Sequence, residues 1–235
     1  MTADNDARSG VPLILMASTL AFASGATDLA SYTRLGGVFA SVMTGNLILL
    51  GLAITRASGT LAAHTAVAFA GYIGGAALGS RIGARSQRQR MLWPPKVTIT
   101  LVAELIAVAG FAIGWELSGT RPAGAGQLWV LAVAALAMGL QSAAVRGIGA
   151  PLSTTYLTGT LTAAVAEIVT AGRRAKGVGL SAAVLTAAVA GAAAGGGVLI
   201  VAPHALPLLP VGAVAIVITA AVTRGVCRPA GHELE

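Results

Sequence analysis

Residues 34–46 read RLGGVFASVMTGN and separate the first two apolar stretches of the chain. The paired glycines favour a break in the helix here, because glycine adopts conformations that other residues avoid. The pieces on either side of the Thr-Gly-Asn triplet, residues 37–43 and 46–56, each cover only about half of a ~30 Å hydrocarbon core at ~1.5 Å per residue. This stretch therefore predicts a half-membrane hairpin with Thr44, Gly45 and Asn46 at its tip.

The composition of the whole chain is typical of an integral membrane protein. Apolar residues make up 56% of the 235 residues and charged residues only 10%, whereas soluble domains carry about 25% charged residues. The net charge of +7 comes from basic residues in short loops between apolar runs, which indicates membrane topology and not a nucleic-acid partner. We expect the lipid bilayer to be the main partner.

Metal, cofactor and enzyme chemistry find little support in the sequence. The single cysteine, Cys227, excludes an internal disulfide framework, and the three histidines have no ligand spacing. No pairing of a nucleophile with a base stands out either. We therefore expect no metal, no cofactor and no catalytic residues.

Eight apolar stretches approach the ~20 residues that are needed to span a bilayer. They lie at residues 12–30, 36–57, 60–82, 96–118, 128–145, 152–171, 178–201 and 206–223. Eight simple crossings would divide the loop arginines and lysines eight against seven between the two sides. Such a balance is at odds with the excess of basic residues in cytoplasmic loops.

The charges separate sharply if the first two stretches together make one net crossing, and the fifth and sixth stretches do the same. The basic residues then divide eleven against two. On the predicted inner side lie Arg8, Arg81, Arg85, Arg88, Arg90, Lys96, Arg173, Arg174, Lys176, Arg224 and Arg228, and on the outer side Arg56 and Arg121. This predicts an all-α protein with six net crossings and both termini cytoplasmic, in a bacterial plasma membrane.

The second half of the chain repeats features of the first half at a distance of 114 positions. Gly25-Ala26-Thr27-Asp28 and Met43-Thr44-Gly45-Asn46 recur as Gly139-Leu140-Gln141-Ser142 and Leu157-Thr158-Gly159-Thr160. With three net crossings in each unit, the second unit must be inverted, as in many transporters. We expect repeats at residues 12–118 and 128–223, each with one interrupted or re-entrant segment, between tails at 1–11 and 224–235.

The two Thr-Gly tips are the predicted solute site. Non-helical backbone at membrane depth must be buried in protein or line a wet cavity, so we expect the tips to meet at the repeat interface near mid-bilayer. The predicted binding residues are Asp28, Thr44, Gly45, Asn46, Gln141, Arg146, Thr154, Thr155, Thr158, Gly159 and Thr160. The alternative is that these side chains cap broken helices and join neighbouring helices.

Three ionisable residues, Asp28, Arg146 and Glu104, are candidates for a functional role, because a charged group inside a membrane usually has a function. Asp28 and Arg146 end the first helices of the two repeats and could gate or orient the solute as a cross-repeat pair, or form a purely structural pair. Glu104 lies eight residues into the fourth stretch. It could couple transport to protons, or it could be a neutral, hydrogen-bonded side chain.

Several of these motifs also resemble a known family. They are Gly25, Asp28, Gly37, Phe39, Met43 to Asn46, Gln141, Arg146 and the string from Ser153 to Thr162, STTYLTGTLT. The chain resembles the YoaK-like family of uncharacterised bacterial membrane proteins over nearly its whole length. The resemblance implies the class of protein and no particular substrate.

The sequence leaves two classes of function open. The primary hypothesis is a transporter or facilitator of a small molecule or ion that the sequence does not identify, and a channel would use the same parts. The alternative is a non-transporting membrane scaffold whose broken helices are structural. Association into a homo-oligomer is compatible with both.

Overall fold

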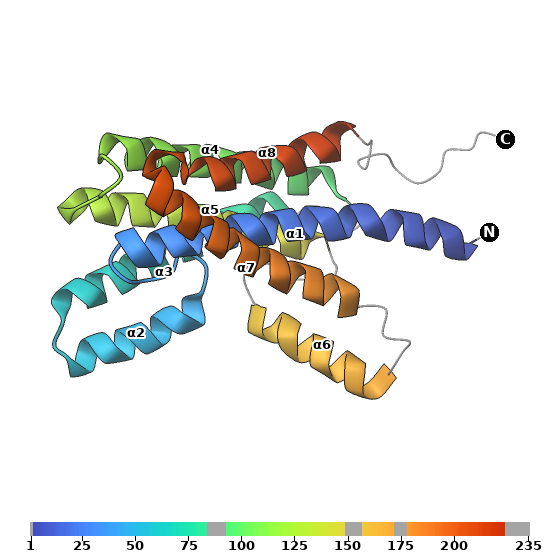
Figure 1. The fold of residues 1–235 in the computed structure, drawn as a ribbon, viewed down its shortest axis with the longest axis horizontal. Coiled ribbons are helices and arrows are strands. Elements are labelled where there is room, and N and C mark those ends of the chain that lie inside the picture. The colour runs from blue at the N-terminus through green and yellow to red at the C-terminus, as the bar shows by residue number, and fades with distance from the viewer. Residues whose placement is uncertain (1, 84–92, 149–156, 172–177, 224–235) are drawn as a thin grey trace.

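A computed structural model of the chain describes residues 2–83, 93–148, 157–171 and 178–223, with the side chains from residue 13 onward and without that of Ala171. These residues form eight α-helices and one 3-10 turn (Figure 1). The elements are α1 (Thr2–Arg34), α2 (Met43–Thr55), α3 (Gly59–Gly83), α4 (Pro95–Leu117), α5 (Gly124–Gly147), α6 (Leu157–Ala171), α7 (Val178–Val201), η2 (Pro203–Ala205) and α8 (Leu208–Thr223).

Six of the helical segments are long and apolar enough to cross a bilayer. They contain 21 to 25 residues, which correspond to about 30 Å or more at ~1.5 Å per residue. The helices α2 and α6 have only 13 and 15 residues and are too short to span. This confirms an all-helical protein with six candidate membrane crossings and two interposed short helices.

The surface of the helices is as apolar as a lipid-facing surface must be. Ile48 on α2, Val169 on α6 and Ile200 on α7 are 77%, 77% and 85% exposed. Large exposed apolar patches are rare on soluble monomers, but in lipid they meet hydrocarbon chains. The exposed side chains therefore agree with a multi-pass membrane protein.

The long helices run roughly along one direction, and α2 and α6 lie along one side of the bundle (Figure 1). Helix α3 packs mainly on α5, α7 packs mainly on α1, and α4 lies against α5 and α8. The short helix α2 rests on α3, and α6 rests on α7. The beginning of α1 and the end of α8 lie at the same end of the molecule (Figure 1), as an even number of crossings requires.

Glycines bring two pairs of helices into backbone contact. A Cβ atom placed on Gly25 of α1 or Gly191 of α7 would lie 2.0 Å from a carbonyl oxygen of the opposite helix. A Cβ atom on Gly75 of α3 or Gly139 of α5 would lie 2.0 or 2.2 Å from such an oxygen. Small residues allow this close approach, which replaces hydrophobic driving force in lipid.

The structure extends the first helix beyond the apolar stretch. Residues 2–11, expected to be part of a tail, form the first turns of α1.

Candidate functional site

A side chain of α1 fixes the irregular segment 35–42 that leads into α2. The backbone N–H of Ser41 donates to Asp28 Oδ1 at 2.8 Å, and the Ser41 hydroxyl donates to Asp28 Oδ2. The hydroxyl of Ser24 donates in turn to the Ser41 hydroxyl at 3.1 Å. Asp28 lies six residues before the end of α1, about 9 Å along the helix, so the chain has returned to this depth where α2 begins.

Asn46 holds the same segment from the other side. Its Oδ1 accepts the Phe39 backbone N–H at 2.9 Å, and its Nδ2 donates to the Phe39 carbonyl oxygen at 2.7 Å. The Asn46 side chain is fully buried, and the Phe39 ring stacks on Tyr32 with the ring centroids 5.2 Å apart. The amide of Asn46 therefore serves the fold of the segment and is not presented to a solute.

The predicted hairpin takes a different form from the one we expected. The leg that returns into the bundle, residues 35–42, is irregular and not helical, and Thr44, Gly45 and Asn46 belong to the first turn of α2. An irregular leg is stable at this depth because Asp28 and Asn46 bind its backbone groups, which would otherwise lack partners.

The two short helices begin in the same way. Thr44 in α2 and Thr158 in α6 are exposed, whereas the residues two positions later, Asn46 and Thr160, are buried. Each exposed threonine is followed by a glycine, Gly45 or Gly159, which is half-buried. In Figure 1 the amino ends of α2 and α6 both point toward the middle of the molecule.

The amino end of α2 carries backbone N–H groups that the helix itself does not use. Its first residue follows Val42, which provides no side-chain cap, and the first turn of any helix leaves N–H groups without helical acceptors. The remaining predicted threonines, Thr154 and Thr155, lie outside the described residues. The structure thus leaves Thr44 and Thr158 as the exposed polar residues in the first turns of these two helices.

Gln141 joins two long helices. Its Nε2 donates to the Leu20 carbonyl oxygen at 3.0 Å, and its side chain is fully buried between α5 and α1. This bond links residues 121 positions apart. In lipid such a bond stabilises helix association, so the structure gives Gln141 a role in packing.

Asp28 and Arg146 do not form an ion pair in the described part of the chain. Asp28 is engaged with Ser41, whereas Arg146 is exposed in the last turn of α5. Arg146 lines a groove of about 330 Å³ between α3 and α5, together with Tyr72 and Ser80. The two residues that the sequence paired therefore belong to different places in the fold.

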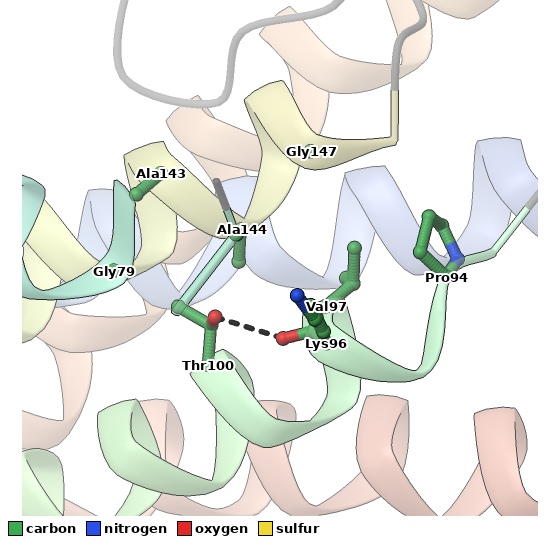
Figure 2. A pocket seen from close by; sticks show the side chains of 9 residues that line it. Gly79, Pro94, Lys96, Val97, Thr100, Ala143, Ala144 and Gly147 are labelled. Atoms are coloured by element: carbon green, nitrogen blue, oxygen red, sulfur yellow. Dashed lines mark hydrogen bonds between the residues drawn. The ribbon is translucent and has the colours of Figure 1, made fainter. Parts of the chain in front are cut away.

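Glu104 of α4 is fully buried. Neither carboxyl oxygen has a hydrogen-bond partner among the described residues. One turn before it, Thr100 lines a small cavity of about 30 Å³ with Lys96 and Gly147, and its hydroxyl donates to the Lys96 carbonyl oxygen at 2.8 Å (Figure 2). The hydrogen-bonded form that we considered for Glu104 thus finds no partner in the described structure.

The sequence analysis did not predict a partly buried chain of hydrogen bonds near the beginning of α3. The Nδ1 atom of His64 lies 2.7 Å from the Thr60 carbonyl oxygen, and Nε2 lies 2.9 Å from Gln127 Oε1. Gln127 donates from Nε2 to the Arg34 carbonyl oxygen at 2.8 Å. These hydrogen bonds join α3, α5 and the end of α1. The only sequence signal for them is the presence of polar residues in or beside apolar stretches.

The described residues contain no cluster of three or more His, Cys, Asp or Glu side chains that could hold a metal.

Comparisons with known proteins found a matching family and a curated relative. The pattern of the family described as "Protein of unknown function (DUF1275)" matches residues 16–221. No solved structure matches the chain.

A curated relative carries a membrane name. Over 152 residues the chain is 32% identical to the UPF0700 transmembrane protein YoaK of Bacillus subtilis (strain 168), and the match covers 64% of this chain and 65% of the relative. The matched part thus spans just under two thirds of that protein. The family match extends over most of the chain, including all six candidate crossings in whole or in large part. The chain is therefore a member of the DUF1275 family, the YoaK-like membrane proteins that its motifs resemble.

Proposed function

We propose that this protein is a secondary transporter or facilitator of a small solute, and not an enzyme. One observation carries the proposal. The short helices α2 and α6 begin with matching Thr-Gly pairs, and the threonines of both pairs, Thr44 and Thr158, are exposed. In transporters, solute sites are often built at the ends of such interrupted helices.

The chemistry of a helix amino end suits a solute site. The N–H groups of the first turn carry about half a positive charge in total and can replace part of the hydration shell of a polar or anionic group. The hydroxyl groups of Thr44 and Thr158 add one donor and two acceptor lone pairs each. The two helix ends and their threonines would together form the site near mid-bilayer.

An inverted repeat would supply the moving parts. We propose that residues 12–118 and 128–223 are the two units. Gly25 and Gly139, which make the close contacts of α1 and α5, are 114 positions apart, and Gly75 and Gly191 of the partner helices α3 and α7 are 116 positions apart. Equivalent crossings at nearly constant spacing favour a twofold plan in which one unit rocks against the other.

The proposed orientation has both termini on the cytoplasmic side of a bacterial plasma membrane. Support comes from the basic residues near the inner ends of α3 and α4, Arg81 and Lys96. Other basic residues that carry this prediction lie outside the described residues: Arg85, Arg88, Arg90, Arg173, Arg174, Lys176, Arg224 and Arg228. The interrupted segments would then be re-entrant, α2 from the outer side and α6 from the inner side.

Glu104 is the proposed site of proton coupling. It is the buried carboxyl group of α4, and no described residue bonds to it. An ionisable side chain within a membrane is uncommon unless it serves a function. A carboxyl group that takes up and releases a proton during transport would explain its place here.

One observation favours the alternative of a non-transporting scaffold. Asp28, Asn46 and Gln141 all bond to backbone groups of this chain, as polar residues do when they only hold helices together. In a scaffold, Thr44 and Thr158 would be surface residues of the two helix ends and would contact no solute. The experiment below therefore removes these two hydroxyl groups.

Transport is tested by solute flux into proteoliposomes that contain purified protein. The solute panel covers inorganic anions and cations, carboxylates, amino acids, sugars and polyols, each with and without a proton gradient. The variants Thr44→Val and Thr158→Val keep side-chain shape but lose the hydroxyl group. Thr55→Val is the matched control, because Thr55 lies at the far end of α2 and its hydroxyl donates only to its own helix, to Leu52.

We expect at least one solute to permeate with wild-type protein and with Thr55→Val, and its flux to fall in Thr44→Val and Thr158→Val. Dependence on the proton gradient that disappears in Glu104→Gln would assign the coupling. Flux that ignores the gradient would indicate a facilitator. Folded protein that passes no solute of the panel would refute transport and favour the scaffold.

A further inference from the structure

The groove between α3 and α5 is lined by both polar and apolar side chains. It measures about 330 Å³, and its polar lining consists of Tyr72 and Ser80 from α3 and Ser142 and Arg146 from α5. Alanine and isoleucine side chains form the rest of the lining. A groove of this size can hold a small polar group together with part of an attached chain.

Arg146 gives the groove an unbalanced positive charge. Its side chain is exposed, and among the described residues it forms no ion pair and no hydrogen bond. Among the residues that the structure describes, no acidic side chain lines the groove. A charged group at the edge of the apolar region is stabilised by a counter-charge, and no described residue supplies one at this place.

The groove begins near the level at which α2 starts, and from there on α2 no longer packs against α3. Helices α2 and α3 are joined by a short turn and pack against each other, so the beginning of α2 lies near the level of Tyr72 at ~1.5 Å per residue. Beyond that level, Ser80 and Arg146 continue the groove toward the end of α5. An occupant would thus lie between Arg146 and the start of α2.

We propose that this groove binds an oxyanion of the phosphate class through Arg146, with the hydroxyl group of Ser80 as a further donor. The planar guanidinium group offers paired N–H donors that match two oxygens of one phosphate group. The phosphate group can belong to a free anion or to the headgroup of an anionic phospholipid. The idea that a free anion is also the transported solute rests on the proposed function. The idea that the groove binds an oxyanion does not.

The test measures binding at equilibrium, without flux. Purified full-length protein in an uncharged maltoside detergent is titrated with inorganic phosphate, and its melting temperature is recorded. A second titration uses phosphatidylglycerol, with diacylglycerol of the same acyl chains as the control that lacks the phosphate group. The variants are Arg146→Gln, Arg146→Lys and, as the matched loss of one exposed arginine outside the groove, Arg81→Gln.

We expect wild type and Arg81→Gln to be stabilised by phosphate or by phosphatidylglycerol and not by diacylglycerol. The half-saturating concentration should rise about tenfold or more in Arg146→Gln, as for the loss of a charge-assisted contact, and less in Arg146→Lys. A response to inorganic phosphate identifies a free anion, and a response to phosphatidylglycerol alone identifies a lipid headgroup. No response to either, or an equal response in Arg146→Gln, overturns the proposal. Binding without flux would leave this site standing while the proposed transport fails.

Discussion

Gly139 of α5 makes the same kind of close backbone contact with α3 as Gly25 of α1 makes with α7. A Cβ atom on Gly25 would lie 2.0 Å from the Ala188 carbonyl oxygen, and one on Gly139 would lie 2.2 Å from the Tyr72 carbonyl oxygen. Both glycines thus bring a helix backbone against a partner backbone at places 114 positions apart. Two helix crossings of one kind therefore hold the long helices together.

The first prediction tests these crossings with two adjacent glycines of α3. A Cβ atom on Gly75 would lie 2.0 Å from the Leu136 carbonyl oxygen, whereas one on Gly74 would meet no atom within 4 Å. Gly75→Ala should therefore destabilise the protein by about 1–3 kcal/mol or more, as overpacking does. Gly74→Ala should be neutral or stabilising by at most about 1 kcal/mol. Melting temperatures in mild detergent compare the two, and equal values would contradict a tight crossing at Gly75.

The second prediction separates the fold of segment 35–42 from solute binding. Asn46→Leu should lower the melting temperature, because it leaves the partly buried N–H and carbonyl groups of Phe39 without their present partners, at up to about 1–3 kcal/mol each. Thr44→Val should leave the melting temperature unchanged, since Thr44 is exposed. If solute flux exists, it should fall in Thr44→Val although the protein stays folded. A large loss of stability in Thr44→Val would assign that threonine to the fold.

The sequence predicted the outline of this fold better than its contacts. The charge asymmetry of the loops and the repeated Thr-Gly pair predicted six crossings and two short segments. Both patterns can be recognised in the sequence without knowing any tertiary contact. The partners of Asp28 and Asn46 could not be predicted, since Ser41 and Phe39 lie in a segment without regular periodicity. The sequence therefore indicated polar residues at this site without indicating which of them the backbone already uses.

The contact network around His64 shows the same limit over longer distances. His64 and Gln127 are 63 positions apart, and Gln127 and Arg34 are 93 positions apart. No local pattern marks such a chain, because each bond depends on how α1, α3 and α5 pack. Only the tertiary structure brings the three residues together.

The third prediction concerns two neighbouring glycines at the start of segment 35–42. Both adopt positive φ angles, +94° at Gly36 and +73° at Gly37, which costs other residues roughly 1–2 kcal/mol. Alanine at Gly37 would meet no atom within 4 Å, but at Gly36 its Cβ would lie 2.2 Å from His64 Cδ2. Gly36→Ala should therefore reduce the melting temperature more than Gly37→Ala.

A double variant checks the cause of that difference. If the clash with the imidazole ring matters, Gly36→Ala in a His64→Ala background should cost only as much as Gly37→Ala does in the same background. The excess cost is then the coupling between residues 36 and 64, which a double-mutant cycle isolates. Additive effects of Gly36→Ala and His64→Ala would show that the ring does not confine Gly36.

The last prediction asks whether Glu104 is kept at the expense of stability. Its two carboxyl oxygens are buried without a partner among the described residues, and an unsatisfied buried polar group costs about 1–3 kcal/mol. Methionine has a similar length and adapts to irregular space, so Glu104→Met should raise the melting temperature. Glu116→Met on the same helix is the control, because Glu116 is half-exposed and bonds to His204 Nδ1 at 2.8 Å, and its loss should be neutral or slightly destabilising. A lower melting temperature in Glu104→Met would mean that the carboxyl group has hydrogen-bond partners in the folded protein. A higher melting temperature together with loss of proton-coupled flux would place the carboxyl group in the transport mechanism.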